Sequence, residues 1–265
     1  MILRFPIALV LSLACLAAPA SADYSAGEEA YYRGDFATAF RELTPLAESG
    51  DAFSEYFLGL MYAQGAGVLQ NFKQAEFWFL LAAEQGHAQA QEVLGGMYAN
   101  GAGVPVDFKE AERWYRSAAE QGEAKAQNNL GLMYATGQGV PQDFKEAVRW
   151  YRLAAGQGES KAQNNLGLMY ATGQGVPQDF KEAMQWYYLA AMQGDADAQH
   201  NLGVLYAKGQ GVLQDYVIAY MWFNLAAVQG EKAATDLLGS LARKMTPAQI
   251  EEAQKLAREW KPKAQ

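Results

Sequence analysis

Apolar and small residues recur along this chain with a fixed period of 36 residues. A leucine, a tyrosine, an aromatic–Ala–Trp set and a GxGV segment return in phase, and the period is marked by six glycines: Gly50, Gly86, Gly122, Gly158, Gly194 and Gly230. Self-similarity at such a period is typical of solenoids, in which each unit buries its apolar face only against its neighbours. The pattern therefore predicts one elongated repeat array without internal linkers.

The first half of each repeat has the spacing of an amphipathic helix. In residues 123–158, which recur as 159–194 with only five substitutions, Ala126, Leu130 and Tyr134 form one apolar stripe. We expect a helix over roughly 124–136, called helix A. Gly131, next to the repeat leucine, has no side chain and should let a second helix approach closely.

The second half of each repeat predicts another amphipathic helix, called helix B. Its apolar positions follow the spacing i, i+3, i+4, i+7, i+8, and in this repeat they are Ala147, Trp150, Tyr151, Ala154 and Ala155. Tryptophan keeps the 36-residue period at Trp78, Trp114, Trp150, Trp186 and Trp222, with Trp260 following 38 residues later. Such in-phase aromatic residues predict a repeat core.

The segment between the two helices should form a tight turn. Gly137 and Gly139 permit positive φ at the end of helix A, and Pro141 excludes helical continuation. Asp143 then predicts an N-cap, and Glu146 three residues later would complete a capping box. The same pairing is possible at Asp107/Glu110 and Asp179/Glu182.

The two ends of the chain depart from the repeat pattern. Residues 1–22 combine Arg4, an apolar run and Ala20-Ser21-Ala22, which predicts a signal peptide cleaved after Ala22 and a periplasmic or secreted product. Lipidation at Cys15 is the alternative. We expect residues 23–50 to form an N-terminal capping half-repeat, 51–230 five full repeats, and 231–265 C-terminal capping helices.

Removal of the leader would leave 20 basic and 29 acidic side chains and no cysteine. A net charge of −9 argues against a nucleic-acid partner, and the missing thiols exclude disulfides. No apolar run after the leader is long enough for a transmembrane helix.

The motifs LGxMY, GxGV, DFKxAxxW and AAxQG at this spacing resemble the Sel1-like repeat (SLR), a longer-looped relative of the tetratricopeptide repeat. The resemblance covers residues 51–230. It implies an all-α fold, a right-handed superhelical solenoid of antiparallel helix pairs that acts as a protein-interaction adaptor. It also implies possible roles in envelope assembly, polysaccharide export, signalling or host contact. Tetratricopeptide repeats proper are the second choice because their period is 34 residues.

The sequence offers little catalytic chemistry. His87 and His200 lie in different repeats at different phases, so no metal-ligand pair is present. The GxG segments follow helices and lack a Walker lysine, which favours structural turns over phosphate binding. We therefore predict a protein without cofactor or metal that is not an enzyme. A cell-wall or β-lactam hydrolase is the least favoured alternative.

A binding surface is the remaining prediction. In the related tetratricopeptide stacks helix A lines the concave face, so we expect that face to bind a protein or peptide partner; an envelope glycan or peptidoglycan fragment is the alternative. The asparagines could bind a peptide backbone or equally bond neighbouring helices. The candidate residues are Tyr56, Asn128, Asn129, Leu132, Asn164, Asn165, Leu168, His200 and Asn201.

Overall fold

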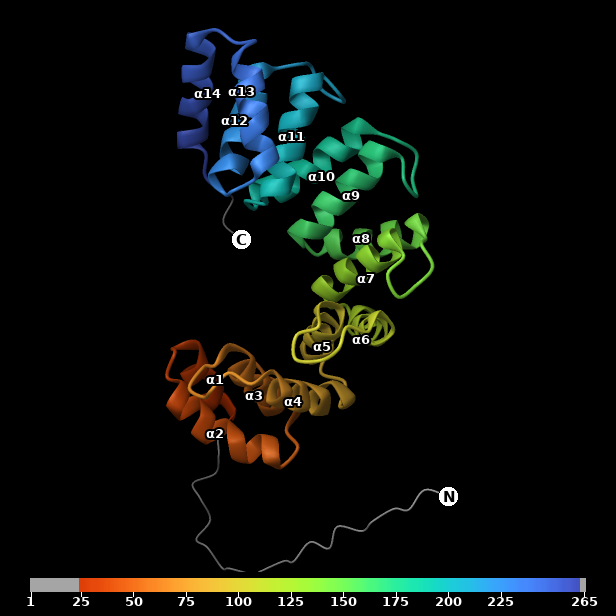
Figure 1. Ribbon diagram of the computed structural model, residues 1–265, viewed down its shortest axis with the longest axis vertical. Coiled ribbons are helices and arrows are strands. Elements are labelled where there is room, and N and C mark those ends of the chain that lie inside the picture. Colours follow the sequence, from red (N-terminus) through yellow and green to blue (C-terminus); the bar gives the residue numbers. More distant parts are fainter. Residues whose placement is uncertain (1–23, 263–265) are drawn as a thin grey trace, which may run out of the picture.

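A computed structural model describes residues 24–262, and this range contains fourteen α-helices and no strand. Figure 1 shows them stacked in chain order along an open crescent. The predicted signal peptide lies outside the described residues. The helices are α1 (Tyr24–Tyr32), α2 (Phe36–Glu48), α3 (Ala52–Gln64), α4 (Phe72–Glu84), α5 (Ala88–Asn100), α6 (Phe108–Glu120), α7 (Ala124–Thr136), α8 (Phe144–Gly156), α9 (Ser160–Thr172), α10 (Phe180–Met192), α11 (Ala196–Lys208), α12 (Tyr216–Val228), α13 (Lys232–Ala242) and α14 (Pro247–Glu259).

The period of the sequence is the period of the fold. The odd-numbered helices α3 to α11 are the helices A and the even-numbered helices α4 to α12 the helices B, each 13 residues long. Helix α7 has the bounds predicted for helix A. Successive helices from α1 to α13 pack on one another and α14 packs on α12, which makes the all-α solenoid of antiparallel helix pairs that the pattern predicts.

The two glycines of each turn are required for different structural reasons. Gly137 ends α7 with φ 76°, in the left-handed region that favours glycine, as predicted. Gly139 also has a positive φ, and a Cβ there would collide with the carbonyl oxygen of Phe108 at the start of α6. The second glycine is therefore a contact with the preceding repeat, because only a bare backbone fits against Phe108.

Helices α6, α8 and α10 begin with the predicted aspartate N-caps but without the predicted capping boxes. Asp143 accepts hydrogen bonds from the backbone N–H groups of Lys145 at 2.8 Å and Glu146 at 3.1 Å. The Glu146 carboxylate pairs with Arg149 at 3.1 Å and does not return to the cap, because the Asp143 N–H already donates to the Tyr134 carbonyl at 2.9 Å. Asp107 and Asp179 likewise cap their helices without a box.

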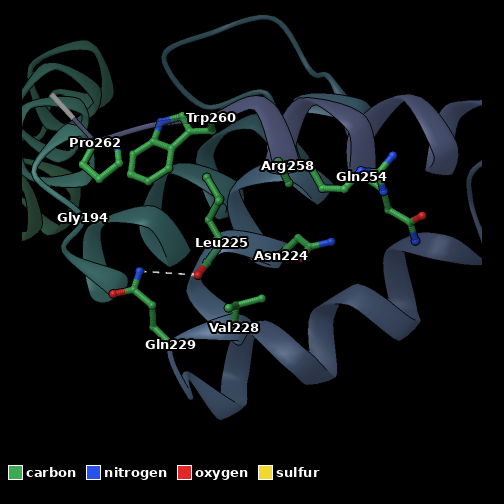
Figure 2. A pocket seen from close by; sticks show the side chains of 10 residues that line it. Gly194, Asn224, Leu225, Val228, Gln229, Gln254, Arg258, Trp260 and Pro262 are labelled. Atoms are coloured by element: carbon green, nitrogen blue, oxygen red, sulfur yellow. Dashed lines mark hydrogen bonds between the residues drawn. The ribbon is translucent and has the colours of Figure 1, made fainter.

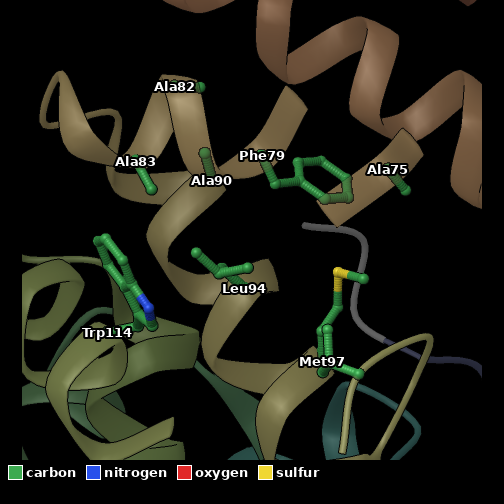
Figure 3. Packing of buried hydrophobic residues seen from close by; sticks show 9 residues of the cluster. Ala75, Phe79, Ala82, Ala83, Ala90, Leu94, Met97 and Trp114 are labelled. Atoms are coloured by element: carbon green, nitrogen blue, oxygen red, sulfur yellow. The ribbon is translucent and has the colours of Figure 1, made fainter. Parts of the chain in front are cut away.

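The core is shared between neighbouring repeats. Trp114 of α6 packs against Ala83, Ala90 and Leu94 of the preceding helices (Figure 3). Trp114, Trp150 and Trp222 are buried, as predicted, and Trp78, Trp186 and Trp260 are partly buried. Because Trp114 and Trp150 each pack in a core formed by the preceding helix B and the helix A of their own repeat, burial of these rings joins one repeat to the next.

A second set of contacts uses buried glutamines that the sequence analysis missed. In four repeats a glutamine at the end of helix B donates to a glutamine of helix A, 30 positions earlier, at 2.7–2.8 Å: Gln121 to Gln91, Gln157 to Gln127, Gln193 to Gln163 and Gln229 to Gln199. We call this set the glutamine ladder. Each helix-A glutamine in turn donates to a backbone carbonyl of the preceding helix B, so the buried amides are paired.

Helices α13 and α14 cover the last repeat. Thr246 and Gln249 form a capping box at the start of α14, and the Trp260 ring packs on Trp222 with centroids 6.2 Å apart. A cleft of about 500 Å³ remains between α12 and α14, with Leu225, Val228 and Trp260 among its lining residues (Figure 2). The C-terminal cap therefore buries the end of the stack incompletely.

Candidate partner-binding surface

The helices A form one continuous wall of the solenoid. In α3, α5, α7, α9 and α11 the residues two positions after the repeat leucine form a column. We call the side of these helices that carries this column the helix-A wall. This column holds Leu60, Gly96, Leu132, Leu168 and Val204. Leu132 and Leu168 are 44% and 40% exposed, so two large apolar side chains of neighbouring repeats face solvent. Isolated exposed leucines are ordinary, but an exposed pair in register on neighbouring repeats offers a partner two regularly spaced apolar contacts.

Amide side chains connect successive helices A beneath this surface. Asn165 of α9 donates to Asn128 Oδ1 of α7 at 2.9 Å, and Asn201 of α11 donates to Asn164 Oδ1 of α9 at 2.9 Å. Asn129 of α7 makes the corresponding bond to Glu92 Oε1 of α5 at 3.3 Å. We call these three pairs the asparagine ladder. Of the two alternatives left open for these asparagines, bonding between neighbouring helices is the one observed.

The ladder stops at both ends because the next residues are apolar. The residue 37 positions after Tyr56 of α3, where the ladder would have a donor, is Val93, and the Tyr56 ring stacks instead on His87 with ring centroids 4.7 Å apart. The residue 37 positions after His200 of α11 is Leu237. Its Nδ1 is buried and has no hydrogen-bond partner within residues 24–262, while its ring packs on Phe223 at 5.6 Å. The hydrogen-bonded part of the wall therefore extends from α5 to α11.

Glu92 is the acidic member of the ladder. Burial raises the pKa of its carboxyl; Lys125 lowers the pKa, whereas Glu123 and Glu159 raise it. Burial also raises the pKa of Tyr56 to about 12, with the charge of Glu92 as the next cause. The wall near α5 and α7 is thus a region where negative charge is concentrated and only partly compensated.

The predicted site residues differ in what they can offer a partner. Leu132 and Leu168 are exposed, and Tyr56, Asn129, Asn164, Asn165, His200 and Asn201 are partly buried. Asn128 is only 5% exposed, and its carbonyl already accepts from Asn165. Asn128 therefore has little accessible surface for a partner, because its side chain lies in the contact between α7 and α9. Partner binding by the others stays a prediction.

The described residues contain no group of three or more His, Cys, Asp or Glu side chains that could hold a metal ion. His87 caps α5, where its Nδ1 accepts from the Ala90 N–H at 3.2 Å, and burial lowers its pKa. Both histidines have packing roles, and neither adjoins the other. In the same range of the chain, every helix lacks the combination of length and apolar character required to span a bilayer.

Comparison with known proteins agrees with this architecture. The profile of the Sel1 repeat matches residues 52–87, 88–123, 124–159, 160–195 and 196–231. A Sel1 repeat protein from Oxalobacter formigenes, known from a crystal structure, is 34% identical with a TM-score of 0.78, covering 90% of this chain and 97% of that one. No curated protein matches the sequence.

A second solved structure is a protective antigen with an SLR fold from uropathogenic Escherichia coli. It is 37% identical, with a TM-score of 0.77 over 90% of this chain and 54% of that protein. Five matched repeats, placed one residue later than the predicted range, cover most of the chain, and their helix pairs are those of the fold described above. The protein belongs to the Sel1 repeat family.

Proposed function

We propose that this protein is an exported, non-enzymatic scaffold that binds a protein or peptide along its helix-A wall. Sel1 repeat proteins are in general protein-interaction scaffolds. The observation that carries the proposal here is the pair of exposed leucines, Leu132 and Leu168, on neighbouring repeats above the asparagine ladder. A surface with periodic apolar contacts and amides between them suits an extended chain.

The asparagine ladder also supports the placement of this wall on the concave side. Asparagine has a short side chain, yet Asn165 and Asn128 meet at 2.9 Å across two successive helices A. Helices A that are close enough for such bonds belong on the inner arc of a curved stack. A partner lying there would contact several repeats at once, which enlarges the buried area without a deep pocket.

The proposal is tested by changing the exposed leucines to a charged residue. The double variant L132D/L168D should lose most partner capture by photocrosslinking in the native envelope, because two apolar contacts become charged. Leu153 and Leu189 of α8 and α10, each 46% exposed, provide the matched control on helix B. L153D/L189D should retain capture, with both variants keeping the helical circular-dichroism signal. Equal loss in the two variants, or no loss in either, contradicts the proposal.

Export is a separate part of the proposal, and it rests on the features of residues 1–22. Cell fractionation should find the protein in the periplasm or medium, with Asp23 as its N-terminal residue. A product that retains residues 1–22 in the cytoplasm contradicts export. A lipid on Cys15 would support the alternative processing.

A glycan partner is the second candidate and has less support. The aromatic residue of the wall, Tyr56, has one ring face covered by His87, with the rings at 24° to each other. A sugar would need such a face free for stacking. Pull-down on purified sacculi distinguishes the candidates, since strong retention that survives L132D/L168D would favour the glycan.

A further inference from the structure

Gly96 interrupts the column of apolar side chains on the helix-A wall. The other four repeats have Leu60, Leu132, Leu168 or Val204 at this place. The backbone does not require glycine, because a Cβ built on Gly96 would meet only the Tyr115 hydroxyl, at 3.5 Å, and its φ is not positive. The missing side chain is therefore unexplained by packing, in contrast to Gly95 next to it, where a Cβ would collide with the Tyr115 ring.

A hollow of about 270 Å³ lies between α5, α6 and α7, and Gly96 adjoins two of its lining residues, Tyr115 and Asn100. Phe108 and Leu132 contribute apolar walls, and Tyr115, Asn100 and Asn129 contribute polar groups. Asn100 is one of these lining residues, and its Nδ2 donates to the Gly96 carbonyl at 2.9 Å. In the next repeat Leu132 stands at the position of Gly96.

The two asparagines of this hollow present acceptors rather than donors to a ligand. Asn100 and Asn129 both use their side-chain nitrogens inside the protein, on the Gly96 carbonyl and on Glu92. Their carbonyl oxygens remain, that of Asn129 with only a 3.5 Å contact from Asn128. A ligand that donates several hydrogen bonds would match these oxygens, whereas an apolar group would leave them unpaired.

The charge beside the hollow has the sign that favours a cation. Glu92 is bonded to Asn129, and its charge is felt at Tyr115, whose pKa is raised first by burial and then by this carboxylate. Glu123 and Glu159 add negative charge around Glu92, against the single Lys125. A carboxylate in a partly desolvated place attracts a cation more strongly than it would in water.

We propose that the Gly96 hollow binds a basic side chain, arginine in particular, of a partner segment that lies along the helix-A wall. The guanidinium has five donors in a planar fork, which suits several amide and hydroxyl oxygens, and its methylene stem can pack on Phe108 and Leu132. This inference rests on the proposed function and specifies the partner: an extended peptide with a basic residue.

The test uses small probes on the mature protein. N-acetyl-arginine amide should shift the side-chain amide NMR signals of Asn100 and Asn129 in a saturable manner. N-acetyl-citrulline amide, which has the same shape without the charge, should bind at least tenfold more weakly, and N-acetyl-leucine amide should leave these signals unchanged. Equal binding of the three probes, or no saturable shift with arginine, overturns the inference.

Two variants test whether the arginine probe binds in the hollow rather than elsewhere on the protein. Gly96→Leu introduces the leucine found in three of the other repeats next to Tyr115 and Asn100, and it should lower arginine binding at least tenfold while the fold is kept. Glu92→Gln keeps an acceptor for Asn129 and should reduce the preference for arginine over citrulline. Undiminished arginine binding in Gly96→Leu overturns the site.

The same variant distinguishes this inference from the proposed function. If photocrosslinked capture depends on Leu132 and Leu168 but is unchanged by Gly96→Leu, the basic-residue pocket is overturned and the scaffold function stands. If the arginine probe binds at Gly96 but capture is insensitive to both leucines, the scaffold function along this wall fails.

Discussion

Asn165 on α9 donates its side-chain amide to Asn128 Oδ1 on α7 at 2.9 Å, and the two residues are 37 positions apart in the chain. Replacing Asn165 with alanine would leave the buried Asn128 carbonyl without this donor. We expect Asn165→Ala to lower the free energy of unfolding by about 1–3 kcal/mol. Urea denaturation followed by circular dichroism measures the change.

The pairing itself is isolated by a double-mutant cycle with Asn128→Ala. The coupling energy should be favourable because each single variant removes the same bond and leaves one polar group unpaired. Strictly additive losses would mean that the ladder contributes nothing to stability beyond the two side chains taken separately.

Neighbouring glycines on α5 should respond oppositely to alanine. A Cβ on Gly95 would lie 2.6 Å from Cδ1 of the Tyr115 ring, so Gly95→Ala should cost about 1–3 kcal/mol of stability. Gly96→Ala meets only the Tyr115 hydroxyl at 3.5 Å and should gain about 0.5–1 kcal/mol, because alanine loses less backbone entropy in a helix. Thermal unfolding of both variants tests the contrast, which fails if they shift in the same direction.

Glu55 should make the stability of the first repeat depend on pH. It occupies the place of the helix-A glutamine in the glutamine ladder, accepts from Gln85 at 2.7 Å and is 2% exposed. Burial raises the pKa of its carboxyl; the bond from Gln85 lowers it, and the charge of Asp51 raises it. The protonated form is thus favoured in the folded state. Its contribution is fully present below the ordinary carboxyl pKa of about 4.3 and is lost as pH rises through the folded-state pKa.

Glu55→Gln therefore should raise stability at pH 7 by about 1 kcal/mol and have little effect near pH 4. Thermal unfolding of both proteins between pH 4 and pH 7 measures this difference in stability. The reciprocal variant Gln91→Glu places a carboxylate where Gln91 donates to the Ala83 carbonyl at 2.9 Å, and should be destabilising at pH 7. A Glu55→Gln effect that is the same at both pH values would exclude titration of this group as the cause.

Trp150 should be essential for local rather than global structure. Its buried ring lies in the core formed by α6 and α7. Trp150→Ala should cost about 3–5 kcal/mol, and hydrogen exchange should increase mainly in the helices around this junction, since repeats interact only with their neighbours. Trp186→Ala, at a partly buried position, should cost less. Uniform loss of protection from α3 to α12 would contradict the one-dimensional description.

Local chemistry was sufficient to predict the repeating fold. The 36-residue period, the apolar spacing around Leu130 and the glycines after Thr136 gave the bounds of α7 and the two-helix unit, because helix periodicity and turn residues act over a few neighbours. The predicted capping box at Glu146 is wrong, because the Asp143 N–H already donates to the Tyr134 carbonyl of helix A at 2.9 Å. Sequence spacing could not reveal this bond across the turn.

The sequence by itself determined a stack of helix pairs and the columns of equivalent residues that run along this stack. Only the tertiary structure decided which columns meet. The Asn165–Asn128 bond joins residues 37 positions apart, the glutamine ladder joins residues 30 positions apart, and the hollow near Gly96 is lined from three different helices. Such distances follow from how closely one repeat packs on the next, and no local propensity specifies them.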